Sequence, residues 1–400
     1  MTRFSALASP VCDGATPCPI GRAFRAFEQE GLHALLARAR REAPVFFAPE
    51  IGYWVVTRRA DVQAIFADVE RFSAAIALDP IAPAPDAVRR ALEDAGFTPE
   101  PVQVNADPPK HGHIRALAGR FLNMRRFLAM EPALRALAED YVERLATRPE
   151  ADLVAEVAYE LPARAILTLL GMPAAVTADV KRRASNRLQF TWGRLDARAQ
   201  MAAAREMAAF WDYSRRLVAD RIARPGDDHA RALLAMRAGD DAVLTPNQIA
   251  GLVFGLLLAG HETTTTTMTH LVHVLLHDRT QWEALVEDPA LIPNAVEAGL
   301  RFAGSAVAWR RVARGPVMMG GVRIPKGGHL LRSIASANRD ETAFDATERF
   351  DVRPENARKH LAFGYGIHVC IGAALARLQQ RLRLETVTAR FPDMTLAPGQ

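Results

Sequence analysis

One cysteine near the end of the chain stands in a setting that could make it a ligand. Cys370 follows the run F-G-Y-G-I-H from Phe363 to His368 and precedes Gly372 and an apolar, helix-forming stretch. The glycines of the run allow unusual backbone dihedrals and a close approach to a flat ligand. Backbone N–H groups at the start of the following helix favour an anionic sulfur. A lone cysteine is usually a small buried core residue, but this combination favours a thiolate presented to haem iron.

A second group of reactive residues lies about 110 residues upstream, inside an apolar helical stretch. The sequence A-G-H-E-T-T runs from Ala259 to Thr264. Glycine and β-branched threonine weaken a helix, so we expect a local distortion there. Thr245 and Gln248 have the spacing of a capping box, which predicts one long helix from this point to about His277.

The periodicity of the rest of the sequence predicts the helices and strands that position these residues. Helical periodicity dominates from about Pro109 to Phe302. A loop over 72–101 is expected to hold one short helix over 86–95. Runs typical of strands lie at 45–47, 54–57, 317–324 and 330–333. The sequence therefore predicts a mainly α fold with a small peripheral β region.

Composition narrows the class of protein. The 400 residues are 50% hydrophobic, and the net charge of +5 is spread over amphipathic helices rather than a basic block, so no nucleic-acid partner is expected. The longest apolar run, Ile249–Ala259, is too short to span a bilayer. We expect no membrane partner, and a cytoplasmic location. Cys12 and Cys18 lie in a leader predicted over 1–22; they do not form a disulfide framework, but could chelate a metal.

The cysteine segment is similar to the proximal-ligand signature of the cytochrome P-450 superfamily, F-G-x-G-x-[HR]-x-C-x-G-x-x-[LI]-A, at every specified position. This resemblance implies the family's mainly α fold in a single haem-thiolate domain over 23–400. It also implies that the usual C-terminal β hairpin is lacking, since the sequence stops at Gln400. The cofactors implied are haem b and O2, with electrons originally from NAD(P)H.

The resemblance also assigns roles to individual residues. Cys370 is the expected iron ligand, and Glu262 and Thr263 match the acid and alcohol of [AG]-G-x-[DE]-T, which guide protons for O–O cleavage. The residues expected to bind the haem, mostly through its propionates, are His111, Arg115, Arg311, Phe363, Gly364 and His368. Arg310 could take the place of Arg311 in this set, and we prefer Arg311. The expected substrate pocket comprises Ala75, Ile76, Leu78, Leu256, Ala259 and Val307.

One motif departs from the family pattern. The family carries E-x-x-R on a helix, but the residue three before Arg301 is Ala298. Glu297 is the neighbouring acid, and Arg353 matches the downstream arginine of the family. Two buried arginines without a shared carboxylate would be costly. We therefore expect either that Glu297 reaches them or that haem retention and stability are reduced.

Within the superfamily, the chain most resembles haem domains of bacterial self-sufficient enzymes, which are fused to a reductase of the phthalate-dioxygenase-reductase type. The segments that carry this resemblance are 50–58, 72–78, 291–297 and 308–313. The expected electron donor is a flavin and iron–sulfur reductase or a ferredoxin. The expected reaction is hydroxylation or O-dealkylation of small apolar substrates, aromatic ones included. Two alternatives stay open: a hydrogen-peroxide-dependent peroxygenase, and a non-catalytic haem-binding homologue.

Overall fold

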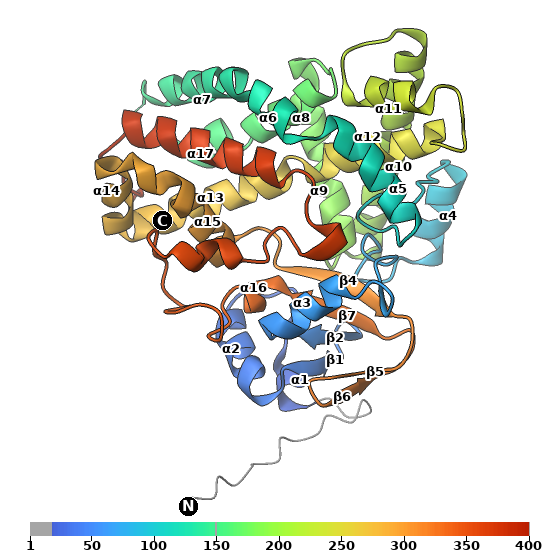
Figure 1. Cartoon of the computed structure of the whole chain (residues 1–400), viewed down its shortest axis with the longest axis horizontal. Helices are drawn as coiled ribbons and strands as arrows, with labels where there is room; N and C mark the ends of the chain where they lie inside the picture. Colours follow the sequence, from blue (N-terminus) through green and yellow to red (C-terminus); the bar gives the residue numbers. More distant parts are fainter. Residues whose placement is uncertain (1–17, 149, 400) are drawn as a thin grey trace, which may run out of the picture. The chain divides into compact units, whose positions relative to one another are not determined.

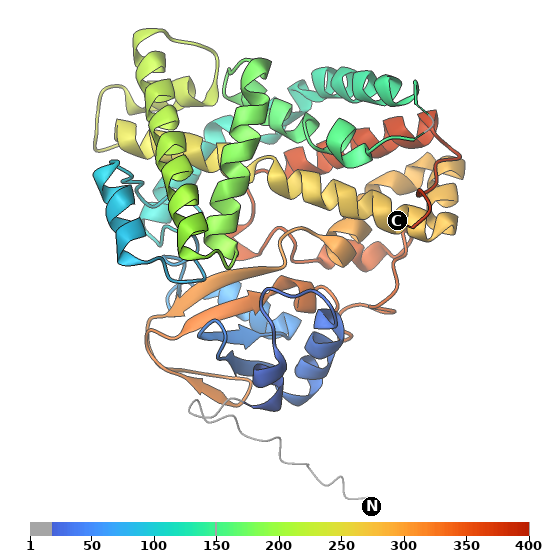
Figure 2. The same cartoon turned by 180° about the vertical axis from the view of Figure 1, so that it is seen from behind.

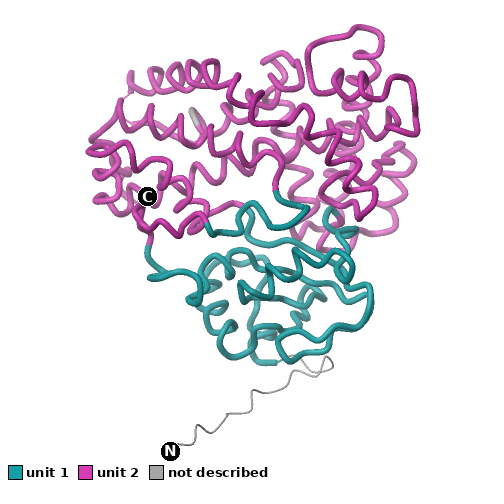
Figure 3. Tube along the Cα trace, in the orientation of Figure 1, with its two compact units in different colours: residues 1–78, 306–349, 359–369 teal, residues 79–305, 350–358, 370–400 magenta. Residues whose placement is uncertain are grey.

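The computed structural model describes residues 18–148 and 150–399 (Figure 1). These residues form two compact units, each built from separate stretches of the chain (Figure 3). Unit 1 contains residues 18–78, 306–349 and 359–369. Unit 2 contains the rest, including 370–399. Most of the predicted leader, with Cys12, lies outside the described residues, whereas Cys18 is buried and its Sγ accepts a hydrogen bond from the Gly21 N–H at 3.5 Å.

Unit 1 is built on a five-stranded sheet with the order β1-β2-β7-β4-β3. The β2–β7 pair is parallel, and the other pairs are antiparallel. The strands are β1 (Val45–Ala48), β2 (Tyr53–Val56), β3 (Phe72–Ser73), β4 (Ala308–Ala313) and β7 (His329–Ser333), with a separate hairpin of β5 (Val317–Met319) and β6 (Val322–Ile324). The helices are α1 (Pro19–Ala23), α2 (Leu32–Glu42), α3 (Arg59–Ala67), α16 (Ile334–Ala337) and the 3-10 turn η5 (Gly366–His368).

Unit 2 is helical. Its first helices are α4 (Asp86–Asp94), α5 (Lys110–Phe121), α6 (Met124–Ala129), α7 (Glu131–Leu145), the π-helix η1 (Val154–Ala158), α8 (Leu161–Leu169), η2 (Ala174–Val176), α9 (Thr177–Trp192), α10 (Ala197–Ala223) and α11 (His229–Arg237). The later ones are α12 (Pro246–Ala259), α13 (Glu262–His277), α14 (Arg279–Glu287), η3 (Pro289–Leu291), α15 (Ile292–Ala303) and α17 (Ala373–Arg390), while η4 (Glu355–Lys359) crosses the boundary between units. Figure 2 shows α9 and α10, in green and yellow-green, side by side.

The mainly α architecture with a small β region is confirmed. The four predicted strand regions are present, although 317–324 is a hairpin that turns at Gly320 and Gly321, both with positive φ. The short helix predicted over 86–95 corresponds to α4. Strands β3 and β4 were not predicted. Strand β3 has only two residues and opens the predicted loop over 72–101, and β4 carries two adjacent arginines that interrupt the alternation of apolar and polar residues.

The capping box predicted at Thr245 is present, but the single long helix predicted to follow it is wrong. The chain forms α12 and α13, separated by Gly260 and His261. A Cβ atom on Gly260 would lie 2.3 Å from Cδ1 of Ile166, so α8 packs where a side chain would otherwise stand. The expected local distortion is thus a complete break. Among the described residues, no helix combines the length and hydrophobicity needed to cross a bilayer.

Candidate active site

Cys370 lies in the turn between η5 and the start of α17. The residue as a whole is exposed, whereas its sulfur is surrounded by protein atoms, with the backbone N–H groups of Gly372 and Ala373 near it. Burial of the sulfur among protein atoms raises the pKa of the thiol, while these N–H groups and the charges of Arg115 and Arg377 act in the opposite direction. The turn therefore offers the donors and cations that a thiolate requires.

The glycines before the cysteine have the conformation expected of them. Gly364 and Gly366 have φ values of 76° and 69°, in the left-handed region. A Cβ atom would lie 3.1 Å from the ring of Phe66 at Gly364, and 3.0 Å from the Phe66 carbonyl oxygen at Gly366. The glycines therefore also let the segment pack closely on α3, a role that the local sequence does not reveal.

Two of the predicted haem-binding cations lie on α5 in unit 2. His111 is buried and Arg115, one turn later, is partly buried. Burial lowers the pKa of the Arg115 guanidinium, and the charge of Cys370 opposes this shift, so Arg115 lies close enough to the cysteine to interact with it. The haem-binding role of both residues stays a prediction.

Two further arginines lie in unit 1: Arg311 on β4, which was predicted, and Arg332 on β7, which sequence reasoning missed. In the β4–β7 register Trp309 is opposite Arg332, which puts Arg311 and Arg332 on the same face of the sheet. The Arg332 guanidinium lies 3.7 Å from the centroid of the Phe66 ring, and none of its nitrogens has a hydrogen-bond partner among the described residues. Burial, with a further effect from Arg311, holds the pKa of Arg332 well below its usual range.

The rival Arg310 points elsewhere, since its Nη2 donates to the carbonyl of Ala77 at 3.0 Å. The preference for Arg311 over Arg310 as a haem-binding residue stays a prediction. One local signal could have revealed Arg332: it lies within the strand-forming run H-L-L-R-S. A charge buried in a strand is costly unless an anion pairs with it. His368 lies in η5, and the half-buried Phe363 precedes it with its ring 5.8 Å from that of His360.

The predicted acid and alcohol open α13 in unit 2. Thr263 is exposed, and its hydroxyl donates to the Ala259 carbonyl at 3.1 Å. Oε1 of Glu262 lies 3.3 Å from Nζ of Lys181 and 3.4 Å from Nε2 of His261. Burial alone would raise the pKa of Glu262, but His261 and Lys181 together bring it below its usual value. Lys181 was not predicted, because it is far from Glu262 in the sequence.

The structure corrects part of what the sequence predicted around Ala298, the position where the family carries a glutamate. Glu297 accepts two hydrogen bonds from Arg377, from Nε at 2.6 Å and from Nη2 at 3.0 Å. Arg353 is not buried: 56% of its side chain is exposed, and it contacts Asp351 at 3.6 Å. Arg301 is buried on α15. The idea of two buried arginines is therefore wrong for Arg353. The carboxylate on α15 instead pairs with α17, the helix that follows Cys370.

The predicted pocket residues are distributed over both units, and none is fully buried. Ala75, Ile76, Leu78 and Val307 belong to unit 1. Leu256 and Ala259 lie at the end of α12 in unit 2. Their common role in binding substrate stays a prediction.

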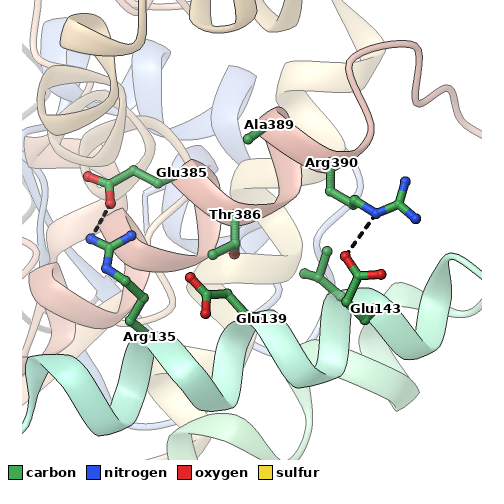
Figure 4. A pocket seen from close by; sticks show the side chains of 8 residues that line it. Arg135, Glu139, Glu143, Glu385, Thr386, Ala389 and Arg390 are labelled. Atoms are coloured by element: carbon green, nitrogen blue, oxygen red, sulfur yellow. Dashed lines mark hydrogen bonds and ion pairs between the residues drawn. The ribbon is translucent and has the colours of Figure 1, made fainter.

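A surface pocket of about 290 Å³ lies between α7 and α17 and contains none of the predicted site residues (Figure 4). Arg135 pairs with Glu385 at 2.7 Å, and Arg390 pairs with Glu143 at 2.9 Å, across this depression. Charged pairs that satisfy each other leave little for a ligand to bind. This depression is therefore no candidate for the predicted site.

Comparison with known proteins identifies relatives of the whole chain. A family model described as Cytochrome P450 matches residues 290–394. Cytochrome P450 107B1 of Saccharopolyspora erythraea is 35% identical over 353 residues, which cover 86% of this chain and 83% of that protein. The solved structure of cytochrome P450 CREJ in complex with (4-ethylphenyl) dihydrogen phosphate is 38% identical, with a TM-score of 0.91 and coverage of 94% of both chains.

A further solved structure, an intact type IV self-sufficient cytochrome P450 monooxygenase, is 35% identical with a TM-score of 0.90. It matches 96% of this chain but 51% of its own length, as expected for a haem domain joined to a reductase. The protein is accordingly a monooxygenase that uses haem b and O2 with electrons from a reductase. On this identity and coverage, the chain belongs to the cytochrome P450 family.

Proposed function

We propose that Cys370 is the axial thiolate of this monooxygenase and that the enzyme oxidises small apolar substrates. The observation that carries the assignment is the turn in which the N–H groups of Gly372 and Ala373 meet the Cys370 sulfur, with Arg115 and Arg377 nearby. Such donors stabilise an anionic sulfur. A thiolate ligand donates electron density that favours O–O cleavage.

The cationic side chains would hold the haem by its two carboxylates. His111 and Arg115 of α5, together with Arg311 and His368, are the predicted set. Arg332 joins this set in our proposal, because a buried guanidinium that lacks an acceptor needs an anion. When bound, the haem supplies the redox chemistry in which O2, two electrons, two protons and a substrate C–H group yield a hydroxyl group and water.

The protein's own part in the reaction is the management of protons. Glu262 is held beside two proton-exchanging groups, and Thr263 follows it at the start of α13. We assign Glu262 the role of acid and Thr263 the role of the hydroxyl that receives its proton. A Glu262 carboxylate in a partly buried setting can exchange protons while bulk water is excluded.

Alkyl-phenyl compounds are the first substrates to test. The notion of small aromatic substrates gains support from the ligand of the related CREJ structure, a (4-ethylphenyl) dihydrogen phosphate. Electrons would come from a flavin and iron–sulfur reductase or a ferredoxin, in line with the self-sufficient relative. Hydroxylation of the alkyl group and O-dealkylation of aryl ethers are the expected outcomes.

The test is the spectrum of the reduced protein with carbon monoxide. Wild type should show the red-shifted Soret band of a thiolate-ligated haem, and Cys370→Ser should lose it, whereas the matched variant Cys18→Ser should keep it. A histidine-type band in wild type would overturn the assignment. Turnover with peroxide alone that exceeds reductase-driven turnover would move the assignment to a peroxygenase.

Arg332 has its own test, in the transfer of haem to an apoprotein acceptor. Arg332→Leu should release haem several-fold faster than wild type, and Arg310→Leu, whose guanidinium binds the Ala77 carbonyl, serves as the control. Equal release from wild type and Arg332→Leu would exclude Arg332 from the haem-binding set.

A further inference from the structure

A second buried arginine, Arg383 of α17, has the same unusual feature as Arg332. Within residues 18–148 and 150–399, these are the two arginines whose three guanidinium nitrogens are all buried without a hydrogen-bond partner. The Arg383 side chain has no exposed surface. From Ala373, the first residue of α17, to Arg383 the helix rises by about 15 Å. Arg383 therefore lies well along the helix from Cys370, and it is not part of the proposed haem-binding set.

Two glutamines lie one turn before Arg383 on the same face of α17. Gln379 and Gln380 are each 1% exposed, and residues three and four positions apart face the same way on a helix. Nε2 of Gln380 donates to the Thr264 carbonyl of α13 at 3.0 Å, but the side-chain carbonyl oxygens of both glutamines have no partner among the described residues. Folded proteins leave few buried polar atoms unpaired. This face of α17 therefore requires partners from outside the protein chain.

The positive charge of Arg383 lacks a counter-charge within the described part of the chain. Burial lowers the pKa of Arg383 to about 9, and no nearby carboxylate of these residues opposes this shift. The guanidinium is therefore still charged at neutral pH. Burial also lowers the pKa of Lys181 on α9, and Arg383 adds to that shift. Glu262 and Glu160 oppose it. The two carboxylates thus act on Lys181 and not on Arg383.

The kind of partner that Arg383 requires follows from charge and size. An isolated buried charge is costly, and a hydrogen-bonded water molecule leaves it uncompensated, whereas an anion supplies both an acceptor and the opposite charge. Complete burial of Arg383 and nearly complete burial of the two glutamines favour a monoatomic ion over phosphate or an organic carboxylate. Chloride is a small inorganic anion that meets both conditions.

We propose that Arg383 binds a chloride ion inside unit 2, beside Gln379 and Gln380. The guanidinium N–H groups donate to the ion, and water that the ion orders donates to the two glutamine oxygens. Gln380 binds α13, and the charge of Arg383 acts on Lys181 of α9. The ion therefore stabilises the packing of α17 against these two helices. The site takes no part in the reaction, so the proposal is independent of the proposed function.

Thermal unfolding in two salts tests the chloride site, and it applies to the protein with or without bound haem. A ligand that binds only the folded protein raises its melting temperature. When about 100 mM sodium acetate is replaced by sodium chloride, the melting temperature of wild type should rise by about 2 °C relative to that of Arg383→Met. Comparison with the variant removes the general effects of the two salts. Equal responses of wild type and Arg383→Met would overturn the proposal.

Arg381→Met is the matched control on the same helix. The guanidinium of Arg381 pairs with Glu131 at 2.7 Å and with Glu385 at 2.8 Å, and it therefore needs no added anion. This variant should respond to chloride as wild type does. A loss of the chloride response in Arg381→Met as large as that in Arg383→Met would assign the response to general electrostatics of α17 and would overturn the chloride site.

Anomalous scattering from wild-type crystals grown in sodium bromide locates the ion directly, and it decides the question where Arg383→Met fails to fold. A bromide peak should lie within hydrogen-bond distance of the Arg383 guanidinium. Water at this place without an anomalous peak would overturn the proposal. A peak without any chloride dependence of the melting temperature would indicate binding at crystal concentration only, and would overturn it as well.

Discussion

Two carboxylates of unit 2, Glu262 and Glu297, are both paired with a cation, yet the pairings differ in kind. Glu262 faces the ammonium of Lys181 and the imidazole of His261 at 3.3 and 3.4 Å. Glu297 accepts two hydrogen bonds from the guanidinium of Arg377, from Nε at 2.6 Å and from Nη2 at 3.0 Å. The partners of Glu262 are groups that can lose a proton, whereas the guanidinium that pairs with Glu297 cannot.

The difference matches the two roles proposed for these acids, Glu262 as a proton carrier and Glu297 as a brace. A bidentate guanidinium fixes both the position and the charge of a carboxylate. Longer contacts with a lysine and a histidine leave the carboxylate free to change its protonation state, because each partner has a pKa that the environment shifts. The geometry of the partners is thus in line with the proposed role of Glu262.

The largest expected effect is on catalysis. Glu262→Gln should lower reductase-driven turnover roughly 100-fold, because the amide cannot carry the proton. The melting temperature should stay close to that of wild type, since glutamine fills the same space. Product formation per NAD(P)H consumed measures the first effect. A fully active Glu262→Gln enzyme would remove the distinction between the two acids.

Glu297→Gln should show the opposite behaviour. Loss of the ion pair should reduce the free energy of unfolding by about 2 kcal/mol, less than for a fully buried pair, because 39% of the Arg377 side chain is exposed. Turnover per haem-loaded molecule should remain close to wild type. Urea titration gives the stability. A large loss of turnover without a loss of stability would contradict the role of brace.

A buried histidine extends the comparison to pH. His229 has no hydrogen-bond partner on either ring nitrogen among the described residues, and burial lowers its pKa to about 4. The unfolded chain, with a histidine pKa of about 6.5, binds more protons below that pH. Stability should therefore fall as pH drops from 6.5 toward 4, by about 2 kcal/mol at pH 5.

Unfolding at pH 7.5 and pH 5 measures this loss, and His229→Phe is the matched variant. The phenyl ring retains the packing against Phe121, whose ring lies 5.1 Å from that of His229. The variant should lose less stability than wild type on acidification. Identical losses in both proteins would assign the acid sensitivity to other groups.

The smallest effect concerns the departure from the family motif. Ala298→Glu places a carboxylate three residues before the buried Arg301, within reach on the same helix. We expect a gain of about 1 kcal/mol in the free energy of unfolding. The change in melting temperature reports it, with Ala295→Glu on the same helix as control. No gain, or a loss from overpacking, would show that α15 has adapted to alanine at this position.

Structural features that depend on neighbouring residues in the sequence could be predicted from it. The glycine turn before Cys370 and the capping box at Thr245 follow from neighbours in the sequence, and both are present. The break between α12 and α13 was expected only as a distortion, since its completeness depends on Ile166 of another helix.

Partners distant in the sequence could not be predicted from it. Lys181 beside Glu262, Arg377 beside Glu297 and Arg332 beside Phe66 are brought together by packing between helices or by strand register. No periodicity of a single segment encodes such pairs. The charged residue inside the strand run H-L-L-R-S was the only local hint of any of the three.

The break at Gly260 has an electrostatic consequence. Because α13 begins at Glu262, this carboxylate occupies the first position of a new helix rather than the interior of an old one. The aligned peptide dipoles place a partial positive charge there, which favours the anion. A chain that continued α12 without interruption would put the same acid among satisfied amides and lose this stabilisation. Packing of Ile166 against the bare glycine thus adds to the stabilisation that His261 and Lys181 give the Glu262 carboxylate, two positions away.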